Sequence, residues 1–106
     1  MEIKEIAHKM KMGLSHADTI IDCDEVSITD TDRIYISFTE SIDAHEIKLQ
    51  DLIRLDCSKE EYVFNKAEEY VNFLLKLMGV DAEVELDYVP INDSNELWVY
   101  GDIVID

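Results

Sequence analysis

The chain is poor in the residues that usually mark special chemistry. It holds three Gly, one Pro, two Cys and three His in 106 residues. So few Gly and Pro exclude collagen-like and linker-like order, and the glycines are too isolated for a phosphate-binding loop. A hydrophobic content of 47% is enough to form a core, so we expect a single domain over residues 1–106.

Long apolar segments are also missing. No apolar run approaches the roughly 20 residues that a membrane-spanning helix needs, and residues 1–13 alternate charged and apolar side chains, unlike a signal peptide. We therefore expect a cytoplasmic protein without a membrane partner. In that compartment Cys23 and Cys57 are expected to be small buried hydrophobic residues.

Catalytic and metal-binding motifs are absent as well. His8, His16 and His45 lie in no G-x-S-x-G or HExxH setting, and nothing pairs them with a nucleophile. The acidic stretches 22–25 and 30–32 offer oxygen ligands, but they lack the glycine and the spacing of a calcium loop. We expect no enzymatic activity, no cofactor and no metal.

Positive charge is scarce. Nine Lys and Arg face 25 Asp and Glu, which gives a net charge of −16. Both halves are acidic, with 12 acids against 5 bases in residues 1–53 and 13 against 4 in 54–106. The acidity therefore belongs to the fold and not to a tail, and it argues against direct contact with nucleic acid or an anionic membrane.

The first half of the chain predicts a helix and a hairpin. Apolar residues spaced by three and four predict a short helix over 2–12, with Gly13 as its C-terminal cap. Alternating apolar and polar residues then predict strands over about 19–29 and 33–39. Residues 44–56 are ambiguous between a strand and a helical turn, and we take them as a third strand.

The second half predicts a long helix and a second hairpin. A capping box at Ser58 precedes a helix over about 59–78 that ends at Gly79. Its apolar arc is too wide for one sheet face to cover, so it should also contact the N-terminal helix or a second subunit. The core stripe of this helix is expected to comprise Val63, Ala67, Tyr70, Val71, Leu74, Leu77 and Met78.

The final segment alternates apolar residues from Ala82 to Tyr88 with Glu83, Glu85 and Asp87, and a return strand follows from Leu97. The predicted fold is a two-layer α+β domain in the order αββ(β)αββ. Its mostly antiparallel sheet packs with one long and one short helix. Whether Leu97 and Val99 or Trp98 and Tyr100 face inward stays open at this point.

The candidate binding residues are chosen for their charge. Glu83, Glu85 and Asp87 should stand on one strand face about 6.6 Å apart, as a row that could imitate nucleic-acid phosphates beside aromatic side chains. The partner-binding set comprises Glu83, Glu85, Asp87, Asp93, Glu96, Trp98 and Tyr100, with Asp22, Asp24, Asp30 and Asp32 as a second patch.

These features favour a non-enzymatic inhibitor that blocks the basic, nucleic-acid-binding cleft of a partner such as a nuclease or toxin. In composition alone, the chain resembles phage anti-CRISPR and antirestriction proteins. The alternatives are an immunity or antitoxin protein that caps a cognate toxin, and a homodimeric structural or regulatory domain. Acidity that serves solubility alone is a further alternative.

Overall fold

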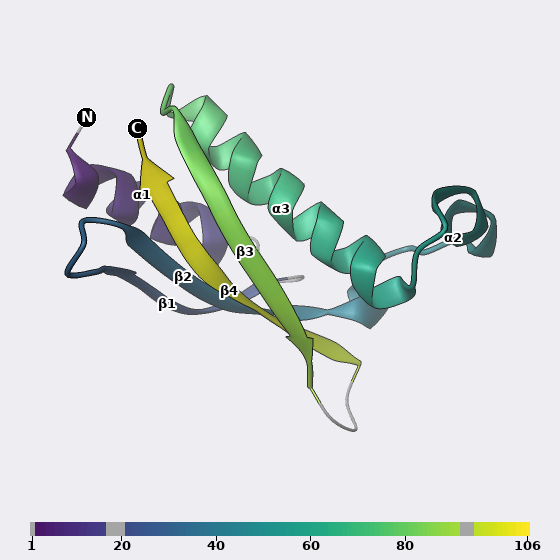
Figure 1. The fold of residues 1–106 in the computed structure, drawn as a ribbon. Coiled ribbons are helices and arrows are strands. Elements are labelled where there is room, and N and C mark those ends of the chain that lie inside the picture. Colours follow the sequence, from purple (N-terminus) through teal and green to yellow (C-terminus); the bar gives the residue numbers. More distant parts are fainter. Residues whose placement is uncertain (1, 17–20, 92–94) are drawn as a thin grey trace.

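A computed structural model describes residues 2–16, 21–91 and 95–106 and shows an α+β domain (Figure 1). Three α-helices, one short 3-10 helix and four strands are present in the described residues. In chain order they are α1 Ile3–Ser15, β1 Ile21–Ile28, β2 Ile34–Ser41, η1 Ile42–Ala44, α2 Leu49–Leu55, α3 Lys59–Leu77, β3 Ala82–Pro90 and β4 Glu96–Ile105.

The four strands form one antiparallel sheet in the order β1-β2-β4-β3. Both predicted hairpins are confirmed, and β2 and β4 pair in the centre, so that Phe38 lies opposite Val99. The first hairpin closes through Thr29, whose amide and hydroxyl both bond to Arg33. Asp32 takes up the left-handed conformation that this turn requires, with φ 57°.

The core lies between one face of the sheet and the helices α1 and α3. Ile34, Ile36 and Phe38 of β2 are completely buried there. They pack in one cluster with the apolar stripes of both helices. The predicted two-layer arrangement of helices on an antiparallel sheet is therefore confirmed.

The N-terminal helix is longer than predicted, because Gly13 does not end it. Helix α1 continues to Ser15, and Gly13 is the point where α1 meets α3. A Cβ atom at Gly13 would lie 2.8 Å from two methyl carbons of Leu74, and the Tyr70 hydroxyl donates to the Gly13 carbonyl at 2.7 Å. This glycine therefore allows two helices to approach closely.

The third strand predicted over 44–56 is wrong. The chain leaves the sheet through η1 and then forms α2, because both sides of β2 are already paired, with β1 and with β4. A strand in this segment would have had to add to an outer strand instead. Figure 1 shows α2 standing away from the sheet, beside the N-terminal end of α3. Leu49 and Ile53 of α2 are both more than 70% exposed.

The long helix begins and ends as predicted. The Ser58 hydroxyl accepts from the Glu61 amide at 3.1 Å, and the amides of Gly79 and Val80 bond back to Lys76 and Leu75, which is a Schellman C-cap. The predicted contact with the N-terminal helix is confirmed by the bond from Tyr70.

The core stripe of α3 only partly matches the prediction. Val63, Ala67, Val71 and Leu75 are buried, although Leu75 lies outside the predicted stripe, whereas Leu77 is 68% exposed. Tyr70, Leu74 and Met78 are half-buried against the core. The buried residues follow a strict spacing of four along the helix. Residues two apart lie about 200° apart around a helix axis, so burial of Leu75 turns Leu77 toward solvent.

Candidate functional site

The orientation of the terminal hairpin decides which side chains are accessible. Leu97 and Val99 are completely buried, so Trp98 and Tyr100 point away from the helices. On β3 the predicted alternation is confirmed, with Glu83, Glu85 and Asp87 exposed. The open question of the sequence is thus resolved in favour of Trp98 and Tyr100 sharing a face with the β3 carboxylates.

The first strand brings its acids to the same face through a β-bulge. The register shifts between Cys23 and Glu25, so that Asp22 lies opposite Thr39 while Glu25 lies opposite Ser37. The carboxylate of the extra residue, Asp24, accepts from the Thr39 hydroxyl at 3.2 Å. Strict alternation from the core-facing Val26 would have turned Asp22 and Asp24 toward the core. The bulge avoids the burial of these two carboxylates.

We call the sheet surface opposite α1 and α3 the open face. It carries carboxylates from three strands, tyrosine and hydroxyl side chains from β2, and the two aromatic residues of β4. The acidic residues of the open face are Asp22, Asp24, Glu25, Glu83, Glu85, Asp87 and Asp102. Among the described residues, Arg33 is the base that pairs with acids of this face.

An aromatic stack occupies the middle of the open face. The rings of Trp98 and Tyr100 are stacked with centroids 4.4 Å apart. The Trp98 indole donates to the Ser37 hydroxyl at 2.6 Å, and Ser37 itself is only 5% exposed. This hydrogen bond holds the indole across β2 and leaves 37% of Trp98 accessible, which suits a rigid anchor at the centre of an interface.

Six of the seven carboxylates lie along the two outer strands, and Asp102 lies on the inner strand β4. Glu83, Glu85 and Asp87 line β3, and the three β1 acids line the opposite edge. Three interstrand spacings of about 4.8 Å place these two rows about 14 Å apart. Arg33 partly neutralises one end, with Nη1 at 3.3 Å from Glu85 Oε2 and 3.6 Å from Asp102 Oδ2.

The charge of the whole chain is segregated in the same way. Residues 2–16 and 48–77, which hold the three α-helices, contain eight acids and eight bases. All the remaining residues together contain seventeen acids and one base, so they carry the entire net charge of −16. The strong negative field therefore originates from the sheet and its connections, and not from the helices.

The structure brings together most of the candidate residues. Glu83, Glu85, Asp87, Trp98, Tyr100, Asp22 and Asp24 share the open face. Glu96 starts β4 opposite Ser41, at one end of the sheet, whereas Asp30 and Asp32 lie in the β1–β2 turn at the other end. The proposed second patch is thus divided along the length of β1, and Asp93 lies outside the described residues.

Among the members of the open face that sequence reasoning missed are two acids and a tyrosine. Asp102 has the same parity as Trp98 and Tyr100 along β4, so the alternation alone could have identified it. Glu25 required knowledge of the bulge, which no local pattern announces. Tyr35 belongs to the polar side of β2 and lies opposite Asp102.

Outside the open face, Glu40 and His45 bring a carboxyl group and an imidazole together. Glu40 is 2% exposed on the core side of β2, with Oε1 3.4 Å from Nε2 of His45. Burial raises the pKa of Glu40 to about 7 and lowers that of His45. Neither Glu40 Oε2 nor His45 Nε2 has a hydrogen-bond partner in the described part of the chain. The side chains of this pair are largely enclosed by the protein, at 3% and 13% exposure.

The cysteines and possible metal ligands offer little chemistry. Cys23 and Cys57 are free and half-buried, so the expected full burial is wrong for both. Burial, followed by Asp24, raises the pKa of the Cys23 thiol, which disfavours the reactive thiolate. Across residues 2–16, 21–91 and 95–106, no group of three His, Cys, Asp or Glu side chains could hold a metal ion.

No family model matches the chain, and neither the curated proteins nor the solved structures contain a significant match. No helix of the described residues is long and apolar enough to cross a membrane.

Proposed function

We propose that this protein is a non-enzymatic binding protein whose open face occupies a basic, nucleic-acid-binding surface of a partner protein. The observation that supports this proposal is the arrangement of seven carboxylates around the Trp98–Tyr100 stack, with Arg33 as the paired base. Such a surface fits a cleft lined by Arg and Lys, because bidentate and charge-assisted hydrogen bonds to carboxylates are strong.

The spacing of the carboxylates supports imitation of a nucleic acid. The two acidic edges lie about 14 Å apart, which is close to the width of about 12 Å of the major groove between phosphate strands in B-DNA. Within β3 the carboxylates recur about every 6.6 Å. A partner that normally binds two phosphate strands would find negative charge at comparable separations.

Electrostatics should act mainly on the rate of association. A net charge of −16 that is concentrated away from the helices attracts a basic partner over several ångströms. At about 0.1 M salt the Debye length is about 10 Å, so this attraction weakens as salt increases. The aromatic stack, which is apolar and rigid, would then supply short-range affinity that salt affects little.

The test compares two variants that lose the same charge. Glu83→Gln, Glu85→Gln and Asp87→Asn together remove three charges from the open face. The matched control, Glu2→Gln, Glu46→Gln and Asp56→Asn, removes three charges from exposed residues outside it. Each immobilised protein is incubated with bacterial lysate and washed at low and high salt, and retained proteins are identified by mass spectrometry.

We expect the wild-type and control proteins to retain the same nucleic-acid-handling protein, and added duplex DNA or RNA to displace it. The amount of that protein retained by the open-face variant should be at least tenfold lower. A nuclease toxin among the retained proteins would indicate the immunity role within this binding mode. Equal capture by both variants, or capture that nucleic acid does not displace, would contradict the proposal.

A further inference from the structure

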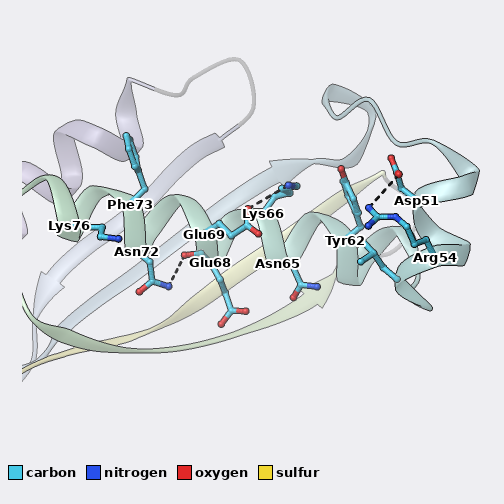
Figure 2. A pocket seen from close by; sticks show the side chains of 11 residues that line it. Asp51, Arg54, Tyr62, Asn65, Lys66, Glu68, Glu69, Asn72, Phe73 and Lys76 are labelled. Atoms are coloured by element: carbon cyan, nitrogen blue, oxygen red, sulfur yellow. Dashed lines mark hydrogen bonds and ion pairs between the residues drawn. The ribbon is translucent and has the colours of Figure 1, made fainter.

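The helices present a second surface, on the side of α3 that faces away from the sheet. We call it the α3 stripe, defined by Tyr62, Lys66, Glu69, Phe73 and Leu77. These residues recur at spacings of three and four, so they lie within one side of the helix. Figure 2 shows Tyr62, Lys66 and Phe73 on one side of α3, away from Asn65 and Glu68.

Large apolar side chains are exposed on and beside this stripe. Phe73 is 53% and Leu77 68% exposed, and α2 adds Leu49, Ile53 and Leu55, each at least 50% exposed. Leu55 lines a groove of about 790 Å³ together with Tyr62 and Phe73. This concentration of exposed apolar surface is unusual for a helix layer in contact with water alone.

The stripe is self-complementary when it is read in opposite directions. Its residues run aromatic, basic, acidic, aromatic from Tyr62 to Phe73. An antiparallel copy whose two-fold axis passes between Ala67 and Glu68 places Tyr62 opposite Phe73 and Lys66 opposite Glu69, twice. The same axis brings α2 of one copy, which precedes α3, to the Phe73–Leu77 end of the other.

Within one chain the polar members of the stripe already interact. Lys66 Nζ lies 3.5 Å from Glu69 Oε2 and 5.6 Å from the centre of the Tyr62 ring. Both charged side chains remain accessible, at 48% and 69%. Lys66 and Glu69 can therefore pair with Glu69 and Lys66 of a second copy, and neither charge is then buried without a partner.

The distribution of charge selects this surface for contact with an identical chain. Two chains of net charge −16 repel each other wherever their sheets approach, but the helical residues 2–16 and 48–77 have no net charge. We infer that a second copy of this chain docks antiparallel on the α3 stripe, which leaves both open faces outward. The inference goes beyond the proposed function and does not depend on it.

The size of the contact sets the affinity of such a dimer, and the charge of the two chains sets its salt dependence. The stripe from Tyr62 to Leu77 is about 22 Å long, which is short for a standard interface of about 800 Å² per partner. We therefore expect micromolar association. High salt should tighten it, because salt screens the repulsion between the two acidic bodies. Binding through the open face should show the opposite dependence.

The first test is sedimentation equilibrium of the purified protein from low micromolar to near-millimolar concentration, at low and high salt. Phe73→Glu should weaken the dimer at least tenfold, while the control Val89→Glu, a similar change at an exposed residue of β3, should not. Lys66→Glu and Glu69→Lys should each weaken the dimer, and the double variant should restore it. Circular dichroism verifies that each variant folds.

Spin labels test the orientation. Single cysteines are placed outside the α3 stripe by Lys59→Cys, Asn65→Cys or Lys76→Cys in a background without Cys23 and Cys57. In the antiparallel arrangement the two labels of a dimer are displaced along the axis by about 8 Å at position 65 and by about 25 Å at 59 and 76. A monomer at all concentrations and salts, a dimer insensitive to Phe73→Glu, or similar distances at all three positions would each overturn the inference.

Discussion

The buried carboxyl of Glu40 makes the stability of this protein depend on pH. Glu40 lies on the core side of β2 and faces His45, from the segment after η1, and the charge of Lys66 of α3 acts in turn on His45. Burial raises the pKa of Glu40 from 4.5 to about 7. Because the raised pKa belongs to the folded state, the folded protein holds a proton that the unfolded chain has already released.

The size of the effect follows from those two values. Each pH unit between 4.5 and about 7 removes about 1.4 kcal/mol of stability as the unfolded chain ionises and the folded chain does not. The contribution of Glu40 to the free energy of unfolding is fully present below pH 4.5. It is lost once the pH has risen through about 7. The total loss is about 3 kcal/mol, a large part of the stability of a small domain.

Glu40→Gln removes this dependence, since the amide never ionises. We expect the stability of the variant to rise relative to wild type by about 3 kcal/mol between pH 4.5 and 8, measured by urea denaturation at each pH. His45, whose pKa burial and Lys66 lower, destabilises both proteins as pH falls below 6.5.

The matched control is Glu46→Gln, which removes an exposed carboxylate from the same segment. Its stability should run parallel to that of wild type across the same range. A Glu40→Gln curve that is also parallel to wild type would refute the claim that burial keeps the Glu40 carboxyl protonated.

Two further substitutions test the packing of the sheet and the helices. Gly101 has φ 155°, and a Cβ there would lie 2.0 Å from the Glu85 carbonyl oxygen. Gly101→Ala should therefore lower the free energy of unfolding by more than about 3 kcal/mol. The midpoint of thermal unfolding should fall by more than about 10 °C. Tyr70→Phe removes the 2.7 Å hydrogen bond to the Gly13 carbonyl, and it should cost about 1 kcal/mol in chemical denaturation, whereas an unchanged midpoint would show that this bond does not hold α1 on α3.

The elements that sequence predicted well are those with local causes. Helix α3 begins after Ser58 and ends before Gly79 because the residues that cap each end lie next to the helix in the sequence. The alternation on β3 correctly assigned Glu83 and Glu85 to solvent, because one buried face imposes a period of two. These signals do not depend on what the element packs against.

The errors arose where contacts with a distant part of the chain determine the local structure. Gly13 resembles a cap by its position, yet its role is to admit Leu74 from a helix sixty residues later. The 44–56 segment has a weak alternation of apolar and polar residues that fits a strand, but β2 has no free edge with which it could pair. Neither outcome can be derived from the residues near these positions.

The sequence by itself determined the charge of this protein, its class of fold and the alternating carboxylates of β3, since composition and period are local properties. Only the tertiary structure decided that Trp98 and Tyr100 join those carboxylates and that a bulge at Asp24 adds a second acidic edge. Strand order and register create a surface, and both depend on which strands pair across the whole chain.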